Sequence, residues 1–252
     1  MDSSSPASIR LSEQLLSLGL DPAALLPRFE YFYDMLMEAN QQMNLTRITD
    51  WEDFCLKHIQ DSLTLLPEIP ETAVTLLDVG TGGGIPGIPL WLVRPQLQIT
   101  MLDSVVKKLK AINEMIQALG QKFPEVRVER PLTLHMRAED AGQDPKYREH
   151  YDVVVARAVA TLPVLVELCL PLVKRTGRFI AMKGPNYETE VQGLSQICGL
   201  LGARIDHVEH IGLGEEQRTL VVFEKRSHTP KTLPRPAGQP KRKPLSEFLL
   251  EE

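Results

Sequence analysis

A buried-strand pattern that runs into a glycine loop is the feature that most constrains the fold of this chain. The apolar run ends in Asp78 and Val79, and the stretch 80–87 that follows is mostly glycine. Glycine allows the backbone to approach a ligand closely, and a helix that follows offers free N–H groups to it. A tight turn without a ligand is the simpler alternative. Glycine destabilises helices and strands, however, so the presence of so many glycines needs a further explanation. The stretch therefore predicts a strand–loop–helix unit that binds a ligand.

A second acid stands where a nucleoside ligand would need it. Residues 98–102 form another strand-like run, and Asp103 follows it directly. An acid at the tip of a neighbouring strand suits a ribose diol. The spacing Gly82-x-Gly84-x-x-Gly87 also matches the dinucleotide fingerprint, so a nicotinamide-dependent enzyme is one candidate.

Three details favour S-adenosylmethionine over a dinucleotide. Asp78 places a carboxylate just before the glycines, where it would repel a pyrophosphate and attract the cationic methionine end of S-adenosylmethionine. Pro86 and Pro89 fall in the opening turns of the next helix, and Pro89 removes an N–H donor that a phosphate would use. The strand-like runs 203–211 and 218–225 form a closing hairpin, which by fold-level analogy is typical of methyltransferase sheets.

Composition places the chain among ordinary globular proteins. Its 252 residues suffice for one α/β domain with an appendage, and 43% of them are hydrophobic and 24% charged. No apolar run approaches the ~20 residues of a membrane span, and the first ten residues lack the pattern of a signal peptide. Cys55, Cys169 and Cys198 lie far apart, which indicates neither a metal site nor a disulfide framework. We expect a cytoplasmic protein.

The chain divides into three predicted regions. Residues 1–70 read as a helical N-terminal region, 71–225 as the Rossmann-like domain and 226–252 as a basic, proline-rich tail. In the first region Asp21 and Pro22 form an N-cap and first-turn pair. Thr49 and Glu52 resemble a capping box, which opens a second helix that continues to residue 66.

Strand–helix alternation begins at residue 74. The predicted strands are 74–79, 98–102, 126–130, 152–156 and 178–182, followed by the closing hairpin. Amphipathic stretches at 104–119, 161–174 and 187–201 separate them. This pattern predicts an α/β fold with a mostly parallel, doubly wound sheet and helices on both faces.

The charge distribution is uneven along the chain. The net charge is -5, yet residues 225–246 combine many Lys, Arg and Pro side chains with no acid. Such a tail cannot bury a core, and we expect it to be extended or mobile. Contact with nucleic-acid phosphates and a merely solubilising role are both open.

Ligands of open α/β sheets bind beyond the carboxyl ends of the strands, so those ends supply the candidate site residues. They are Asp78 with Gly80, Asp103, Ala138 with Glu139, Arg157 and Lys183. We expect Asp103 to bind the ribose hydroxyls, which is compatible with capping the helix after Ser104. Ala138 and Glu139 would frame the adenine, although a solvated loop acid is the alternative for Glu139.

Arg157 bears on the methyl acceptor. Methyltransferases that act on exocyclic amines usually carry an Asn/Asp-Pro-Pro-aromatic run after the fourth strand, which is absent around Arg157. A ring nitrogen such as guanine N7 is already nucleophilic and mainly needs to be held in line with the methyl group. We expect Arg157 to serve guanine O6, a phosphate or the cofactor, with a structural ion pair as the alternative. No cysteine falls at a strand end, so no covalent mechanism through cysteine is indicated.

His58 and Asp61 lie one helical turn apart. They either line the mouth of the substrate site or form a satisfied surface pair. The remaining histidines have no ligand spacing, so no metal is expected.

Several short motifs occur together and in order. They are Asn44-Leu45-Thr46, His58-x-x-Asp61-Ser62-Leu63, DVGTGGGIPGIPL, LDSVVKK, Arg137-Ala138-Glu139, ARAVA and Phe179-Ile180-Ala181-Met182-Lys183-Gly184, with a TPKxxPRxxGxPxxxP tail. Their combination, from about residue 30 to 244, resembles the bacterial small-subunit ribosomal RNA guanine-N7 methyltransferases, also called glucose-inhibited division protein B.

This resemblance implies a substrate and a set of site residues. The substrate would be a guanine in the 530 loop of 16S rRNA, in free RNA, an assembly intermediate or the complete small subunit. The cofactor-binding residues that it implies, together with those expected from the glycine loop, are Asp78, Gly80, Gly82, Ile85, Asp103, Ser104, Ala138, Glu139 and Arg157. The substrate-side candidates are Asn44, His58, Arg157, Lys183 and Arg218. Many family members carry phenylalanine where this chain has Ile85, which alters one apolar contact with the cofactor.

Two other functions compete with the methyltransferase. One is a nicotinamide-dependent oxidoreductase, and the other is a non-catalytic RNA-binding or ribosome-assembly protein that keeps the pocket as a relic. Binding of NADH would support the first, and RNA binding without methyl transfer the second. No heptad pattern argues against a monomer, which is the state we expect.

Overall fold

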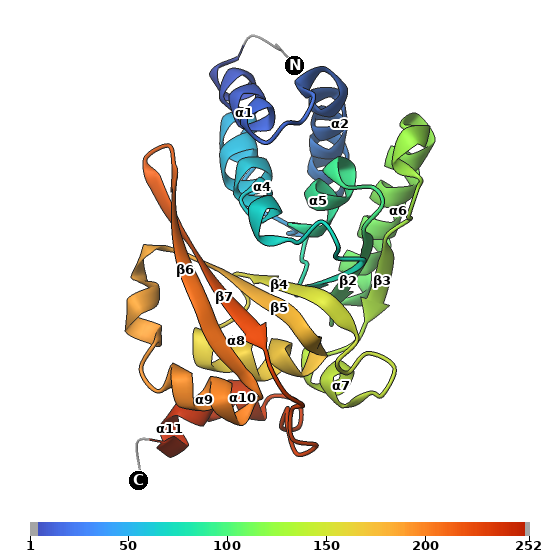
Figure 1. The fold of residues 1–252 in the computed structure, drawn as a ribbon. Coiled ribbons are helices and arrows are strands. Elements are labelled where there is room, and N and C mark those ends of the chain that lie inside the picture. The colour runs from blue at the N-terminus through green and yellow to red at the C-terminus, as the bar shows by residue number, and fades with distance from the viewer. Residues whose placement is uncertain (1–4, 250–252) are drawn as a thin grey trace.

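Within residues 5–249, which the computed structural model describes, the core of the molecule is a seven-stranded sheet. The strands are β1 Thr75–Val79, β2 Gln98–Asp103, β3 Leu132–His135, β4 Tyr151–Arg157, β5 Val173–Lys183, β6 Ala203–Leu213 and β7 Glu216–Lys225. Their order across the sheet is β3-β2-β1-β4-β5-β7-β6 (Figure 1). The first five strands are parallel, and β7 runs antiparallel to both β5 and β6.

Helices surround this sheet. The α-helices are α1 Pro6–Ser17, α2 Pro22–Asn40, α3 Trp51–Phe54, α4 Asp61–Leu63, α5 Gly87–Val93, α6 Val106–Lys122, α7 Ala138–Gln143, α8 Leu162–Cys169, α9 Leu194–Leu200, α10 Gln239–Arg242 and α11 Leu245–Leu249. A π-helical segment, η1 Cys55–Gln60, joins α3 to α4, and the 3-10 turns are η2 Leu66–Glu68, η3 Pro124–Val126, η4 Leu170–Leu172 and η5 Pro185–Glu190. None of the helices in the described part of the chain is long and apolar enough to span a membrane.

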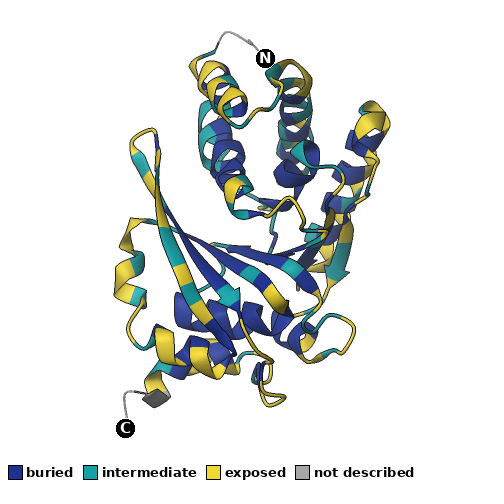
Figure 2. Cartoon of the chain, in the orientation of Figure 1, coloured by how far each residue is buried: buried dark blue, intermediate teal, exposed yellow. Residues whose placement is uncertain are grey.

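Both faces of the sheet are covered, because side chains alternate along each strand. On β4, Val153 and Val155 pack into the core cluster that contains α1, α2, α5 and α6. Val154 and Ala156 pack into the opposite cluster, which contains α7, α8 and α9. Figure 2 shows the buried strands between these two helical layers, with the exposed residues on the outer sides of the helices. The predicted α/β fold, a mostly parallel sheet with helices on both faces, is confirmed.

The first helix start after residue 20 is as predicted, and the second is not. Asp21 caps α2, since its carboxylate accepts a hydrogen bond from Ala23 N at 3.0 Å. The Thr49 capping box is wrong, because Asp50 is the residue that caps α3. Glu52 instead reaches α1, where its carboxylate accepts from Ala7 N and pairs with Arg10. The helix does not run unbroken to residue 66, because η1 interrupts it and α4 ends at Leu63.

The third strand lies later in the chain than predicted. Residues 126–130 alternate like a strand, but Val126 ends a 3-10 turn that Pro124 opens. The Val126 carbonyl accepts a hydrogen bond from Trp91 Nε1 at 3.0 Å, so it does not pair with a strand. The true strand begins at Leu132, whose side chain is exposed at the edge of the sheet, and this exposure weakened the apolar pattern.

The C-terminal tail, as far as residue 249, is folded against helices α8 and α9 rather than extended or mobile. Leu233 and Leu245 are buried in the core cluster of α8 and α9. Figure 1 shows the tail crossing below the sheet, beside α8 and α9. The tail lacks the hydrophobic residues for a core of its own, yet it completes the core of the domain. The boundaries at residues 70 and 225 stay predictions.

Candidate active site

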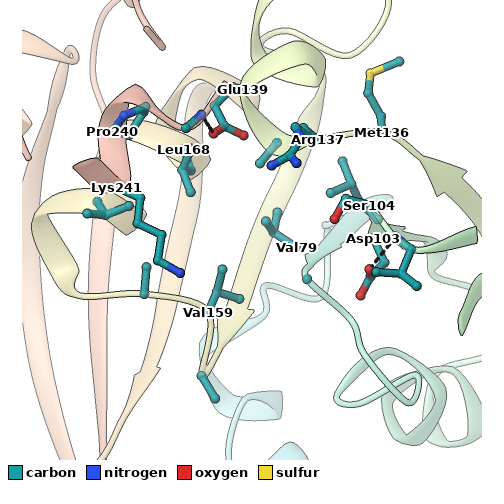
Figure 3. A pocket seen from close by; sticks show the side chains of 18 of the residues that line it. Val79, Asp103, Ser104, Met136, Arg137, Glu139, Val159, Leu168, Pro240 and Lys241 are labelled. Atoms are coloured by element: carbon teal, nitrogen blue, oxygen red, sulfur yellow. Dashed lines mark hydrogen bonds between the residues drawn. The ribbon is translucent and has the colours of Figure 1, made fainter. Parts of the chain in front are cut away.

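A cavity of about 380 Å³ opens at the carboxyl ends of β1, β2 and β4. Its lining residues are Val79, Gly80, Leu102, Asp103, Ser104, Val105, Lys108, Met136, Arg137, Ala138, Glu139, Ala158, Val159, Ala160, Val164, Leu168, Gly238, Pro240 and Lys241. Figure 3 shows Asp103 and Ser104 on one side of it, Pro240 and Lys241 on the other, and Glu139 above. Five predicted cofactor residues therefore share one cavity: Gly80, Asp103, Ser104, Ala138 and Glu139.

The glycine loop brings its backbone to the edge of this cavity. Gly80 has φ +72, and a Cβ there would lie 2.7 Å from the Val159 side chain. Gly84 has φ +85, and a Cβ there would lie 2.6 Å from Ile88. Any other residue at these two positions would be strained as well as crowded. The loop therefore allows its backbone to lie close to a bound ligand.

Asp103 is held in place by backbone N–H groups on both of its oxygens. Oδ2 accepts from Gly82 N at 3.1 Å, and Oδ1 accepts from Val105 N at 2.9 Å. Each carboxylate oxygen has a further lone pair, so the group retains capacity to accept from a ligand. Gly82 does not line the cavity itself, but this hydrogen bond joins it to a residue that does.

Asp78 organises the loop from below rather than lining the cavity. Its Oδ2 accepts from Thr81 Oγ1 at 2.6 Å and from Gly87 N at 3.0 Å. Its Oδ1 is buried and has no hydrogen-bond partner in the described part of the chain. Burial raises the pKa of this carboxyl to about 6, against the opposing effect of the two hydrogen bonds and Arg157.

The raised pKa of Asp78 predicts a measurable pH dependence of stability. The folded state holds this proton more tightly than the unfolded chain, so the contribution of Asp78 to stability is full below pH ~4 and lost as the pH rises through about 6. The variant Asp78→Asn cannot lose a proton. Relative to the wild type, its free energy of unfolding should rise by up to about 3 kcal/mol between pH 4 and pH 7. Urea unfolding of both proteins across this range measures the difference, and a constant difference would contradict the prediction.

A second polar cluster lies beside the glycine loop, where η1, α4, β4 and β7 meet. Asp61 is 1% exposed and binds two guanidinium groups: its Oδ1 accepts from Arg218 Nε at 2.8 Å, and its Oδ2 lies 3.1 Å from Arg157 Nη1. His58 lies between Arg157 Nη2 at 3.1 Å and Thr46 Oγ1 at 2.8 Å. The surface-pair interpretation of His58 and Asp61 is therefore wrong, because both are buried.

The titration of this cluster follows from its burial. Desolvation and the neighbouring guanidinium of Arg157 lower the pKa of His58 to about 4, so its ring is neutral near pH 7. Desolvation raises the pKa of Asp61, and Arg157 and Arg218 oppose this shift. Arg157 and Arg218 share the Asp61 carboxylate, and Arg218 also pairs with Glu216 at 3.5 Å, so the two arginines face two carboxylates. Both guanidinium groups remain partly exposed, so they can still donate hydrogen bonds to an anionic ligand.

The remaining predicted residues lie outside the cavity. Ile85 is buried in the core cluster beside α5 and α6. Lys183 pairs with Glu190 at 2.8 Å and donates to the Ala160 carbonyl, at the rim of the cavity. Asn44 lines a separate open hollow with Thr46 and its neighbours.

Two features of the site escaped the sequence interpretation. Asn40 shapes the loop below the polar cluster, because its Oδ1 accepts from the backbone N–H groups of Leu45 and Thr46. In the sequence, Asn40 shows only as part of a polar link that follows a helix. The tail supplies Gly238, Pro240 and Lys241 to the cavity wall, which no local pattern indicates.

The cysteines and histidines give no sign of other chemistry. Cys55, Cys169 and Cys198 are buried, and burial raises the pKa of each thiol. Across residues 5–249, no group of three or more His, Cys, Asp or Glu side chains is arranged to hold a metal ion.

Comparison with known proteins gives a consistent result. A family model described as "rRNA small subunit methyltransferase G" matches residues 25–221. A ribosomal RNA small subunit methyltransferase G from Acetivibrio thermocellus is 44% identical over 223 residues, 88% of this chain and 89% of that protein. One of the same name from Desulfitobacterium hafniense is 40% identical over 238 residues, 94% of this chain and 95% of that protein.

Solved structures resemble this one in fold at low sequence identity. An O-methyltransferase from Bacillus cereus, in complex with S-adenosylhomocysteine, matches with a TM-score of 0.54 and 14% identity over 77% of this chain and 90% of that chain. A magnesium protoporphyrin IX methyltransferase from Synechocystis, with bound S-adenosylmethionine, matches with a TM-score of 0.50 and 14% identity over 89% of this chain and all of that chain. At such identity the likeness concerns the fold alone.

Proposed function

Because the chain belongs to the rRNA small subunit methyltransferase G family, and is thus an S-adenosylmethionine-dependent methyltransferase, we propose that it methylates N7 of a guanine in the 530 loop of 16S rRNA. The observation that carries this proposal is the family match over residues 25–221, which includes the glycine loop, the cavity wall up to Leu168 and the polar cluster. The oxidoreductase alternative loses its support, since the matched family is one of methyltransferases.

The cavity suits the cofactor. In this proposal the carboxylate of Asp103, fixed by Gly82 N and Val105 N, accepts from the two ribose hydroxyls. Glu139 lines the same cavity with Ala138, in a position for the adenine. Gly80 allows the backbone to pass close to the methionine part, and the carboxylate of Asp78, buried beneath the loop and outside the cavity, would attract the ammonium group through its negative charge. When bound, S-adenosylmethionine supplies a methyl group activated by its sulfonium.

The residues around the cavity are consistent with a ring-nitrogen acceptor. The in-plane lone pair of guanine N7 carries no proton at neutral pH, so no general base is needed. Among the described residues that line the cavity there is no cysteine or histidine, and His58 beside it is a weak base because its pKa is about 4. We infer that the protein accelerates the reaction by holding the guanine in line with the methyl group and by excluding water.

The polar cluster is our candidate for the RNA-facing side. Arg157 and Arg218 share the Asp61 carboxylate and keep part of their surface exposed. Guanidinium groups bind phosphates and guanine O6 well. A donor on N7 would block the reaction, so we assign Arg157 to O6 or to a phosphate. His58 contacts Arg157, whereas Asn44 and Lys183 lie apart from this cluster and stay substrate-side candidates by family resemblance alone. A cytoplasmic location and action on the small subunit or its assembly intermediate follow from this substrate, and a monomer remains our prediction.

Transfer to RNA tests this proposal. The purified protein is incubated with methyl-labelled S-adenosylmethionine and unmodified 16S rRNA or small subunits, with 23S rRNA as the control RNA. After digestion to nucleosides, the label should co-elute with N7-methylguanosine from 16S rRNA and be absent from 23S rRNA. Label on another nucleoside would contradict the N7 assignment. RNA binding without any label would support the non-catalytic alternative.

A further inference from the structure

The C-terminal tail is anchored to the domain by several specific polar contacts. Arg148 donates to the carbonyls of Thr229, Pro230 and Leu233 at 2.7 to 3.0 Å. Gln143 donates to the Pro234 carbonyl at 2.7 Å. Backbone carbonyls of a mobile segment would be solvated instead, so this tail has one defined path.

The strongest anchor is a buried ion pair. Glu167 on α8 is fully buried, and both of its oxygens accept from the Arg235 guanidinium, at 2.8 and 2.7 Å. Oε1 also accepts from Arg235 N at 3.0 Å, so the pair fixes the backbone of the tail as well as the side chain. A carboxylate with no exposure requires such a partner, which makes detachment of the tail at Arg235 costly.

Three residues beyond this anchor, the tail reaches the cavity. Gly238 N donates to Glu139 Oε1 at 2.8 Å, as Figure 3 shows beside Glu139. Gly238 has φ +80, a backbone conformation that other residues rarely adopt. No hydrogen bond in the described part of the chain engages Oε2 of Glu139, and the residue lines the cavity. The tail therefore occupies one oxygen of Glu139 and leaves the other for a ligand.

We propose that the tail from Thr229 to Arg242 determines the base specificity of the cofactor pocket. Arg235 is a positioning residue: through Glu167 it holds Gly238, which in turn orients Glu139 so that Oε2 accepts from the 6-amino group of adenine. This inference rests on the cofactor site proposed above, but not on the RNA target. It assigns to the basic tail a role in recognition of the adenine of the cofactor.

A matched pair of ligands measures this role without any methyl transfer. S-adenosylhomocysteine carries the 6-amino donor, whereas S-inosylhomocysteine carries a 6-oxo acceptor that the Glu139 carboxylate would repel. Because a site built to accept from an amine rejects an analogue that lacks it, the wild type should bind the adenosyl ligand at least about 10-fold more tightly. Calorimetry gives both dissociation constants.

The tail variant is Glu167→Gln with Arg235→Ala. The double substitution releases the anchor without leaving a charged carboxylate buried alone, so the domain should fold, which circular dichroism and thermal unfolding check. We expect the preference for the adenosyl ligand to fall below about threefold. Arg226→Ala, which removes an exposed ion pair between the start of the tail and Glu224 on β7, should keep the wild-type preference.

Glu139→Gln with an intact tail provides the complementary test. The carbonyl of the substituted side chain would accept from Gly238 N and direct the amide NH₂ into the cavity, so the preference should shift towards the inosyl ligand. An unchanged preference in the tail variant, or equal weakening of both ligands, would overturn the proposal. If the wild type bound neither ligand, the cofactor site itself would be wrong, whatever the RNA target.

Discussion

Asp103→Ala should weaken binding of S-adenosylhomocysteine by about 100-fold or more and leave the affinity for RNA unchanged. Two hydrogen bonds from a ribose diol to a carboxylate are each worth about 1.5–3 kcal/mol, and tenfold in affinity is about 1.4 kcal/mol. The substitution also releases Gly82 N and Val105 N, which Asp103 now holds. The cofactor is therefore expected to lose both its acceptor and the fixed shape of the loop.

Calorimetry with S-adenosylhomocysteine and filter binding with 16S rRNA separate the two effects. Asp103→Asn is the conservative control: its amide keeps one acceptor oxygen but presents an NH₂ to a backbone donor, so an intermediate loss is expected. Glu129→Ala, on the loop before β3 and outside the cofactor cavity, should leave cofactor binding at the wild-type level. If Asp103→Ala lowered RNA and cofactor affinity equally, or lowered neither, the cofactor assignment of this cavity would fail.

Asp61→Asn should have the largest effect on stability and should also abolish most methyl transfer. It leaves Arg157 and Arg218 facing each other without their shared carboxylate. Removing one partner from a buried ion pair costs about 3–5 kcal/mol, or roughly 10 °C in melting temperature for a chain of this length. Since Asp61 lies outside the cofactor cavity, binding of S-adenosylhomocysteine should stay within about threefold of the wild type.

A neighbouring ion pair gives the matched control. Asp53 pairs with Lys57 one turn away, at 3.0 Å, but it is half exposed. Asp53→Asn should change the free energy of unfolding by less than about 1 kcal/mol and leave methyl transfer intact. Thermal unfolding and labelled methyl transfer are measured side by side for both variants. Full activity of a folded Asp61→Asn protein would remove the polar cluster from the proposed reaction.

The parts of the fold that sequence could predict are those with local physical signals. Buried strands such as β4 carry continuous apolar runs, and the glycines of the loop after β1 are destabilising unless a tight turn or a close approach requires them. Strand β3 was misplaced because it is an exposed edge strand, whereas the nearby Val126 is buried through contact with Trp91. Strand prediction depends on the pattern of apolar residues. An exposed edge strand lacks that pattern, and a residue buried outside the sheet can imitate it.

Contacts between distant segments account for the rest of the differences. Asp61 and Arg218 stand far apart in the chain, and only the packing of the β6–β7 hairpin against the N-terminal helices brings them together, as Figure 1 shows. The composition of the tail suggested disorder, yet its few apolar residues fill gaps in an existing core and its arginine meets the buried Glu167. Composition reports whether a segment can fold alone, not whether it can dock.

The most direct test of the proposed function locates the modified base. Unmodified small-subunit RNA is incubated with the protein and S-adenosylmethionine, then treated by reduction and aniline, which cleaves the strand at N7-methylguanine. We expect one new cleavage in the 530 loop, absent when Asp103→Ala replaces the wild type. Cleavage at another guanine, or none in any assembly state of the RNA, would contradict the proposed function.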